Sequence, residues 1–225
     1  MGVGAVSTLS LLRMRSNESR SATLLSYILL GNLPQVVLSF LYLMYNGLYT
    51  CMLQGHEWSN YAHERKTVRV TSPVGKQRST YYLTLPYTYA VPLLFFSGLL
   101  HWLVSQSLFL VSITMYDGDQ VVDNITTCGY SCIAIIFVLI VGSTLLLAGV
   151  ALGFRRYKPG MPLASSCSAA ISAACHPPAD DVGAAVLPLM WGVVDDDIDG
   201  VGHCSFTSRE VVPPVKGRLY AGSVQ

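Results

Sequence analysis

The sequence predicts a mainly α-helical integral membrane protein, with about three transmembrane helices and a small cytoplasmic α+β part. Its 225 residues are 52% hydrophobic and only 12% charged, which is about half the charged share of an ordinary soluble domain. The charges avoid three stretches, Ala22–Leu53, Ser79–Tyr116 and Asn124–Phe154. Each stretch is longer than the roughly 20 apolar residues that cross a bilayer. This pattern excludes a soluble enzyme, a disordered chain, a coiled coil and a disulfide-rich secreted module.

Each uncharged stretch is expected to hold one transmembrane helix, because a single span must satisfy its backbone hydrogen bonds internally. We place these helices at residues 24–53, 89–115 and 131–154. In the first, Pro34 predicts that the helix either begins near Asn32 or kinks there. The second has a proline in its first turn, where proline is tolerated. Two arginines follow the third.

The basic residues predict the orientation, because positively charged loops stay on the cytoplasmic side. The loop at residues 54–88 is rich in lysine and arginine, and the tail at residues 155–225 opens with further basic residues. The loop at residues 116–130 has no basic residue and several aspartates. We therefore expect residues 54–88 and 155–225 in the cytoplasm. The N-terminal segment 1–23 and the acidic loop are expected outside.

Two further features of the sequence concern the segments that are expected outside. The sequence has two acceptor sequons for N-glycosylation, at Asn17 and Asn124, and both fall in segments expected outside. Three arginines between residues 13 and 20 oppose this orientation, because they place positive charge outside. The first twenty residues lack the apolar core of a removable signal peptide, so the first span is expected to direct insertion itself.

The cytoplasmic segments are expected to fold together. Residues 55–66 should continue the first helix along the membrane surface, with Trp58 and Tyr61 as aromatic anchors. Residues 67–86 combine β-branched alternation with a Pro-Val-Gly-Lys turn, which predicts a β-hairpin. Because a lone two-stranded hairpin is marginal in water, this hairpin should pack against the C-terminal tail.

Short motifs along the chain resemble one protein family. They are Asn32-Leu-Pro-Gln35, Arg69-Val-Thr-Ser-Pro73, His101-Trp-Leu-Val-Ser105, the stretch from Cys167 to Pro178, and Gly202-His-Cys-Ser-Phe206. Taken in this order, they are similar to the C-terminal part of uncharacterised multi-pass membrane proteins of filamentous fungi, known by a domain of unknown function. The resemblance implies further spans before this part in longer members. It implies no activity, because none is established for that family.

Polar residues form a stripe on each of the first two spans. On a helical wheel the first stripe contains Asn32, Gln35, Ser39, Asn46 and Thr50, and the second contains Ser97, His101, Ser105 and Ser112. Intramembrane polar residues face a bundle interior or a water-filled path. One interpretation is a pathway or small-ligand site with His101 as its proton-sensitive element. The interpretation that we favour is hydrogen bonding between helices, because Ser, Thr and Asn are common packing residues.

The third span carries a face of small residues, namely Gly142, Gly149 and Gly153. The last two form a GxxxG motif, which lets two helix backbones approach closely. Packing within the chain is the simpler interpretation, and a homo-oligomer is the alternative.

No motif indicates catalysis, a cofactor or a metal site. Five tail residues could supply metal ligands, but their spacing differs from that of structural zinc sites; they are Cys167, Cys175, His176, His203 and Cys204. His56-Glu57 and His63-Glu64 do not form HExxH. We therefore expect no enzyme, no cofactor and no bound metal. The net charge of +1 gives no reason to expect nucleic acid as a partner.

These observations together predict a multi-pass membrane protein without catalytic activity, whose cytoplasmic part is an interaction surface of a scaffold or sensor. Its expected partners are the lipid bilayer and other membrane helices, including those of a second copy. The alternative is a transporter or channel component with a polar path between the first two spans, although three spans are few for a transporter. The plasma membrane is the expected location, with an internal membrane as the alternative.

Overall fold

The computed structural model describes residues 11–12, 20–118, 120–164, 166–196 and 201–221. These residues belong to two compact units. The first unit draws on Met1–Gly47 and Thr88–Gly153, and the second on Leu48–Tyr87 and Phe154–Gln225. The units are described one at a time.

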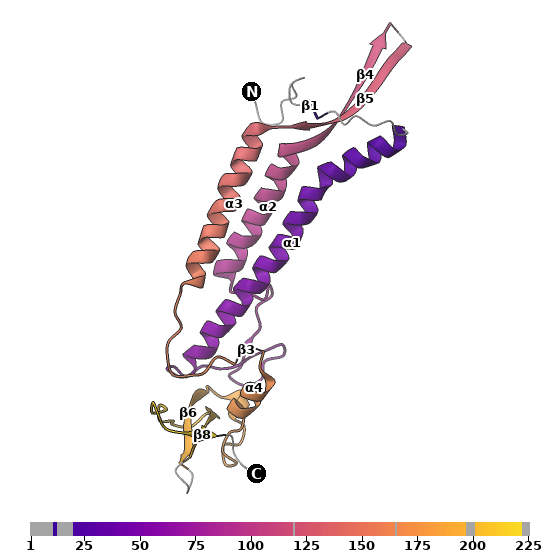
Figure 1. Ribbon diagram of the computed structural model, residues 1–225. Helices are drawn as coiled ribbons and strands as arrows, with labels where there is room; N and C mark the ends of the chain where they lie inside the picture. The colour runs from indigo at the N-terminus through magenta and orange to yellow at the C-terminus, as the bar shows by residue number, and fades with distance from the viewer. Residues whose placement is uncertain (1–10, 13–19, 119, 165, 197–200, 222–225) are drawn as a thin grey trace. The chain divides into compact units, whose positions relative to one another are not determined.

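Three helices dominate the first unit: α1 (Arg20–Asn60), of which the part up to Gly47 belongs here, α2 (Tyr87–Ser107) and α3 (Cys132–Gly153). Figure 1 shows the three side by side. Within the described part of the chain, these are the three helices long and apolar enough to cross a membrane. Most of their large apolar side chains are exposed, an arrangement that suits lipid far better than water.

The first helix differs from the prediction at its start. It begins at Arg20 and continues through Pro34, so a start near Asn32 is wrong. Figure 1 shows α1 bending in its N-terminal part, as expected for a helix that retains an internal proline.

The second helix is shorter than predicted, because residues 108–115 are strand. Strand β4 (Leu108–Asp117) pairs antiparallel with β5 (Gln120–Tyr130), and β1 (Leu11–Leu12) pairs with the other edge of β5. The predictions of a membrane helix that continues to Met115 and of a loop at residues 116–130 are therefore wrong, because both segments form strands. The reason is composition, since both segments are rich in β-branched residues, which favour strands. Gly118, with a φ of 63°, makes the tight turn between the strands.

The second unit joins the end of α1 to the loop after it and to the tail. The loop supplies β2 (Arg69–Val70) and β3 (Arg78–Ser79). The tail supplies α4 (Ser168–Ala174), the 3-10 helix η2 (Ala184–Val186), and the sheet β6 (Met190–Asp196), β7 (Gly202–Thr207) and β8 (Tyr220–Ala221).

The predicted packing of the loop against the tail is confirmed. The ring of Phe206 in the tail meets the rings of Trp58 and Tyr61 edge-on, with centroids 5.2 Å apart in both pairs. Lys66 and Leu189 exchange two backbone hydrogen bonds of 2.9 and 2.8 Å. Apolar side chains from both segments therefore form one core.

The predicted hairpin is wrong, because β2 and β3 pair in parallel, with Arg69 opposite Arg78. The turn between them is closed by hydrogen bonds between Val74 and Gln77, and it also contacts η2. The Lys76 amide donates to the Val186 carbonyl at 3.2 Å, and the Gln77 side chain donates to the Ala185 carbonyl at 2.9 Å. The tail thus binds the turn between β2 and β3. The helix predicted to reach residue 66 ends at Asn60.

Candidate functional site

An open groove of about 820 Å³ in the second unit combines aromatic, apolar and charged side chains. Three segments line it: residues 50–61 at the end of α1, residues 69–86 of the following loop, and residues 157–166 at the start of the tail. We call this the groove. Its aromatic wall consists of Trp58, Tyr61, Tyr81 and Tyr157, and its charged lining residues are Glu57 and Arg69.

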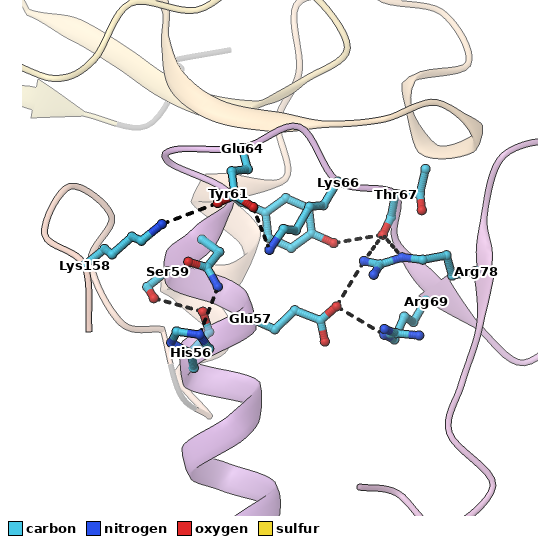
Figure 2. Close-up of polar contacts among 11 residues, drawn as sticks. His56, Glu57, Ser59, Tyr61, Glu64, Lys66, Thr67, Arg69, Arg78 and Lys158 are labelled. Atoms are coloured by element: carbon cyan, nitrogen blue, oxygen red, sulfur yellow. Dashed lines mark hydrogen bonds and ion pairs between the residues drawn. The ribbon is translucent and has the colours of Figure 1, made fainter. Parts of the chain in front are cut away.

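The charged side of the groove is organised around Glu57 (Figure 2). One carboxylate oxygen, Oε1, accepts from Arg69 Nε at 3.1 Å and from Arg78 Nη2 at 3.0 Å. Arg78 also donates to the Thr67 carbonyl. Two guanidinium groups thus share one carboxylate, which leaves one net positive charge in this cluster.

Arg69 is held in a fixed orientation. Its Nη1 donates to the Ser79 carbonyl at 3.2 Å, its Nη2 donates to Tyr81 Oη at 2.6 Å, and its guanidinium lies 4.1 Å from the centroid of the Tyr81 ring. A guanidinium has five N–H groups. Three of them have partners among the described residues, which leaves two for a further acceptor.

Tyr61 connects the cluster to the core. Its hydroxyl donates to the Thr67 carbonyl at 3.2 Å. Burial raises the pKa of the Tyr61 phenol, and the negative charge of Glu57 raises it further, against a smaller opposite effect of Arg78 and Arg69. The phenol therefore stays protonated at neutral pH and serves as a donor.

A second polar cluster in this unit surrounds the buried Asp181. Its carboxylate accepts from the Thr207 hydroxyl, and from the hydroxyl and amide of Ser208, the amide at 2.8 Å. Burial alone would raise the pKa of Asp181, but the hydrogen bonds from Ser208 and Thr207 and the charge of Arg209 together lower it.

Acid should therefore weaken the second unit through Asp181. Because its pKa is lower in the folded state than its ordinary value of 3.8, the ionised group stabilises the fold at neutral pH. That stabilisation begins to fall near 3.8 and is lost as the pH drops through the folded-state pKa. Hydrogen exchange of the full chain between about pH 6 and about pH 3 measures this. Asp181→Asn should flatten the acid dependence, and an equally steep dependence in that variant would contradict the assignment.

The predicted polar stripes meet at one point in the first unit. Gln35 Nε2 donates to the His101 carbonyl at 2.9 Å, and His101 Nδ1 lies 2.5 Å from Gln35 Oε1. This double contact joins α1 to α2. The other stripe residues are not brought to it. Asn32, Ser39 and Ser105 hydrogen-bond carbonyls of their own helices.

The remaining stripe residues lie in different settings. Thr50 belongs to the second unit, where it lines the groove. Ser112 lies in β4 and not in a helix. Asn46 and Ser97 are half-buried. Gln35 and His101 are the stripe residues for which the structure gives a side-chain contact between α1 and α2.

On the glycine face of α3, a side chain of another helix packs closely against Gly149 but not against Gly142 or Gly153. A Cβ on Gly149 would lie 2.0 Å from Tyr45 Oη, whereas one on Gly142 or Gly153 would have nothing within 4 Å. The Tyr45 hydroxyl donates to the Leu145 carbonyl. Gly149 therefore admits the Tyr45 ring between α1 and α3, and this packing is within one chain.

The other predicted site residues fall as follows. His203 lies 3.1 Å from the His176 carbonyl, while Cys167 and Cys175 are exposed and Cys204 is half-buried. Where the structure describes the chain, it places no three His, Cys, Asp or Glu residues where they could hold a metal ion. Asn124 is in β5, and Asn17 lies outside the described residues.

Sequence reasoning missed the groove. It identified Trp58 and Tyr61 as membrane anchors, and it used Arg69 only as part of a basic loop and of a family motif. The available signal was the presence of aromatic residues a few positions from charged ones, at Tyr81 and Tyr157 as well as these two. Their convergence depends on tail contacts that no local pattern shows.

These features define a class: a chain that is about half helical, with three helices long and apolar enough to cross a membrane and several small sheets, divided into two compact units. Residues 13–201 match the family described as Domain of unknown function (DUF8419), and the chain belongs to that family. The predicted membership in a family known by a domain of unknown function is thereby confirmed. No curated protein and no solved structure matches the chain.

Proposed function

We propose that the protein is a multi-pass integral membrane protein whose second unit is a cytoplasmic interaction surface of a scaffold or sensor. The exposure of large apolar side chains along α1, α2 and α3 carries the proposal, because a water-soluble chain would bury them. The basic loop and tail that form the second unit support a cytoplasmic position. The short motifs of the sequence support a fungal source.

The absence of catalysis is part of the proposal. The organised polar side chains of the second unit are engaged in structural contacts. Glu57 holds two arginines, and Asp181 holds the loop after β7. Both carboxylates thus have a structural role, and this supports the proposal that the unit is not catalytic.

The orientation provides the direct test. We expect an outside N-terminus and a cytoplasmic C-terminus, because the basic residues flank the second unit. A glycosylation sequon appended to the C-terminus should stay unmodified in membranes, and protease added outside should spare the chain near Lys76. Modification of the C-terminal sequon, or cleavage near Lys76 in sealed cells, would contradict the orientation.

The Gln35–His101 pair favours one alternative, a transporter or channel component. It is an ionisable side chain between two helices that are apolar enough to cross a membrane, and such residues often mark ion or proton pathways. The two side chains also hydrogen-bond each other's residues directly, which supports simple packing and makes this the second candidate.

His101→Gln separates the two functions. We expect normal expression and unchanged flux, because glutamine keeps hydrogen-bonding capacity without titrating near neutral pH. The measurement is pH-dependent ion flux into liposomes that hold the purified chain. Flux that is present in the unaltered protein and lost in a normally expressed His101→Gln variant would favour the transporter. His101→Leu is a poorer probe, because it strands the Gln35 amide at a cost of about 1–3 kcal/mol.

A further inference from the structure

We propose that the groove binds an anionic phospholipid, with the lipid phosphate on Arg69 and the glycerol and acyl portion along the aromatic wall. This inference rests on the proposed membrane placement and adds a ligand class to the second unit.

Charge is the first argument. The cluster at the charged side of the groove holds two guanidinium groups and one carboxylate, Arg69, Arg78 and Glu57. Its net positive charge attracts an anion. Arg69 lines the groove and keeps two N–H groups without partners among the described residues. A guanidinium presents its N–H groups in a planar fork that matches phosphate oxygens.

Preorganisation is the second argument. A flexible surface arginine loses side-chain entropy when it binds a ligand. Arg69 has already been ordered by Glu57, the Ser79 carbonyl and Tyr81. The fold therefore meets this entropic cost before any ligand arrives, which favours specific binding over diffuse attraction.

The walls of the groove indicate a lipid rather than a free phosphate. Leu53 and Leu163 line it together with four aromatic side chains, and Trp and Tyr are enriched at the level of lipid headgroups. The lining also begins at Thr50, within the helical stretch that is apolar enough to cross a membrane. A free phosphate would leave this apolar surface uncovered. The volume of about 820 Å³ lies within the range typical of small-molecule sites.

The same residues argue against a cationic headgroup. Aromatic residues can form a cage for quaternary ammonium groups. In this groove the face of Tyr81 is already covered by the Arg69 guanidinium, and the cluster has a net positive charge. A choline or ethanolamine group placed there would meet repulsion.

Three soluble probes and the full chain, purified in detergent, test the proposal. Dihexanoyl phosphatidic acid carries both phosphate and chains, dihexanoylglycerol carries chains alone, and inorganic phosphate carries the anion alone. We expect saturable binding of the first, at least about tenfold tighter than of either other probe, because only the first uses both parts of the groove. Isothermal titration calorimetry reports binding, so the same readout serves variants that carry an added tryptophan.

A groove-filling variant keeps the test independent of folding. Ser166 is exposed and lines the groove, so Ser166→Trp should obstruct it without removing a charge. Ser168→Trp is the matched control, since Ser168 is exposed on α4 outside the lining. We expect about tenfold weaker phosphatidic acid binding in the first variant and unchanged binding in the second. Arg69→Lys should also weaken binding, because it keeps the charge and loses the fork.

Each other outcome overturns the proposal. If inorganic phosphate binds as tightly as dihexanoyl phosphatidic acid, the acyl chains do not contribute to binding and the ligand is not a lipid. If dihexanoylglycerol binds as tightly, the phosphate and its charge do not contribute. Unsaturable binding, or a Ser166→Trp variant that binds as well as the control, would show that the groove is not the binding site. None of these results depends on orientation in a membrane, so the topology experiment can fail or succeed independently.

Discussion

Replacing Trp191 with alanine is expected to destabilise the second unit by about 3–5 kcal/mol, the usual cost of deleting a buried aromatic side chain. Trp191 is only 6% exposed and lies in the core that joins loop and tail. Its amide also donates to the Tyr61 carbonyl at 2.9 Å. Loss of the indole leaves a cavity between the two segments, so both should open together.

Limited proteolysis and hydrogen exchange of the full chain measure this effect. We expect faster exchange in residues 61–70, in β6 and in β7, with no change in α3. Val182→Ala is the matched control, because Val182 is 88% exposed in the same unit and its truncation should cost less than about 0.5 kcal/mol. Protection of the loop that survives in Trp191→Ala would show that the loop is held without the tail.

Gly149→Leu should produce the second large effect, in the first unit. Even a single added carbon would lie 2.0 Å from Tyr45 Oη and 2.7 Å from its ring carbon Cζ. The ring must move away, and its hydrogen bond to the Leu145 carbonyl is then lost. Overpacking of this kind usually costs about 1–3 kcal/mol. We expect a lower melting temperature and a less uniform preparation in detergent.

Gly153→Leu provides the control from the same helix, because nothing lies within 4 Å of a Cβ at that position. It should leave the melting temperature unchanged. Size measurements on both variants also address association between copies. An oligomer that dissociates in Gly153→Leu but not in Gly149→Leu would show that the exposed glycine serves a second chain. Equal stability of the two variants would contradict the role assigned to Tyr45.

Sequence patterns located the three apolar helices, because the gaps in charge are long and hydropathy does not depend on distant contacts. They failed at residues 108–115, where apolar residues fit a membrane helix and a strand equally well by hydropathy. The β-branched character of Val111, Ile113 and Thr114 was the discriminating signal. The opposing strand, Gln120–Tyr130, supplies the partner that such residues need.

The site could be predicted only in part. The aromatic residues beside α1 were visible, but the position of Arg69 depends on Glu57, Ser79 and Tyr81, which are brought together by a parallel pairing that turn residues do not predict. A helical wheel could not show which stripe residues connect the helices, because polar side chains on a helix can hydrogen-bond the preceding turn instead, as Ser39 and Ser105 do.

The order of synthesis means that the second unit cannot complete its core until the end of the chain has been made. Its loop is made early, but the partners of that loop come from the end of the chain; Arg65 donates to the Ser208 carbonyl across 143 positions. Contacts this distant in sequence form slowly, because a long loop must close before they stabilise anything. Trp58 and Tyr61 are therefore synthesised well before their partner Phe206. Until Phe206 is made, their apolar faces stay accessible to chaperones. A premature stop codon after α3 would leave them permanently without that partner.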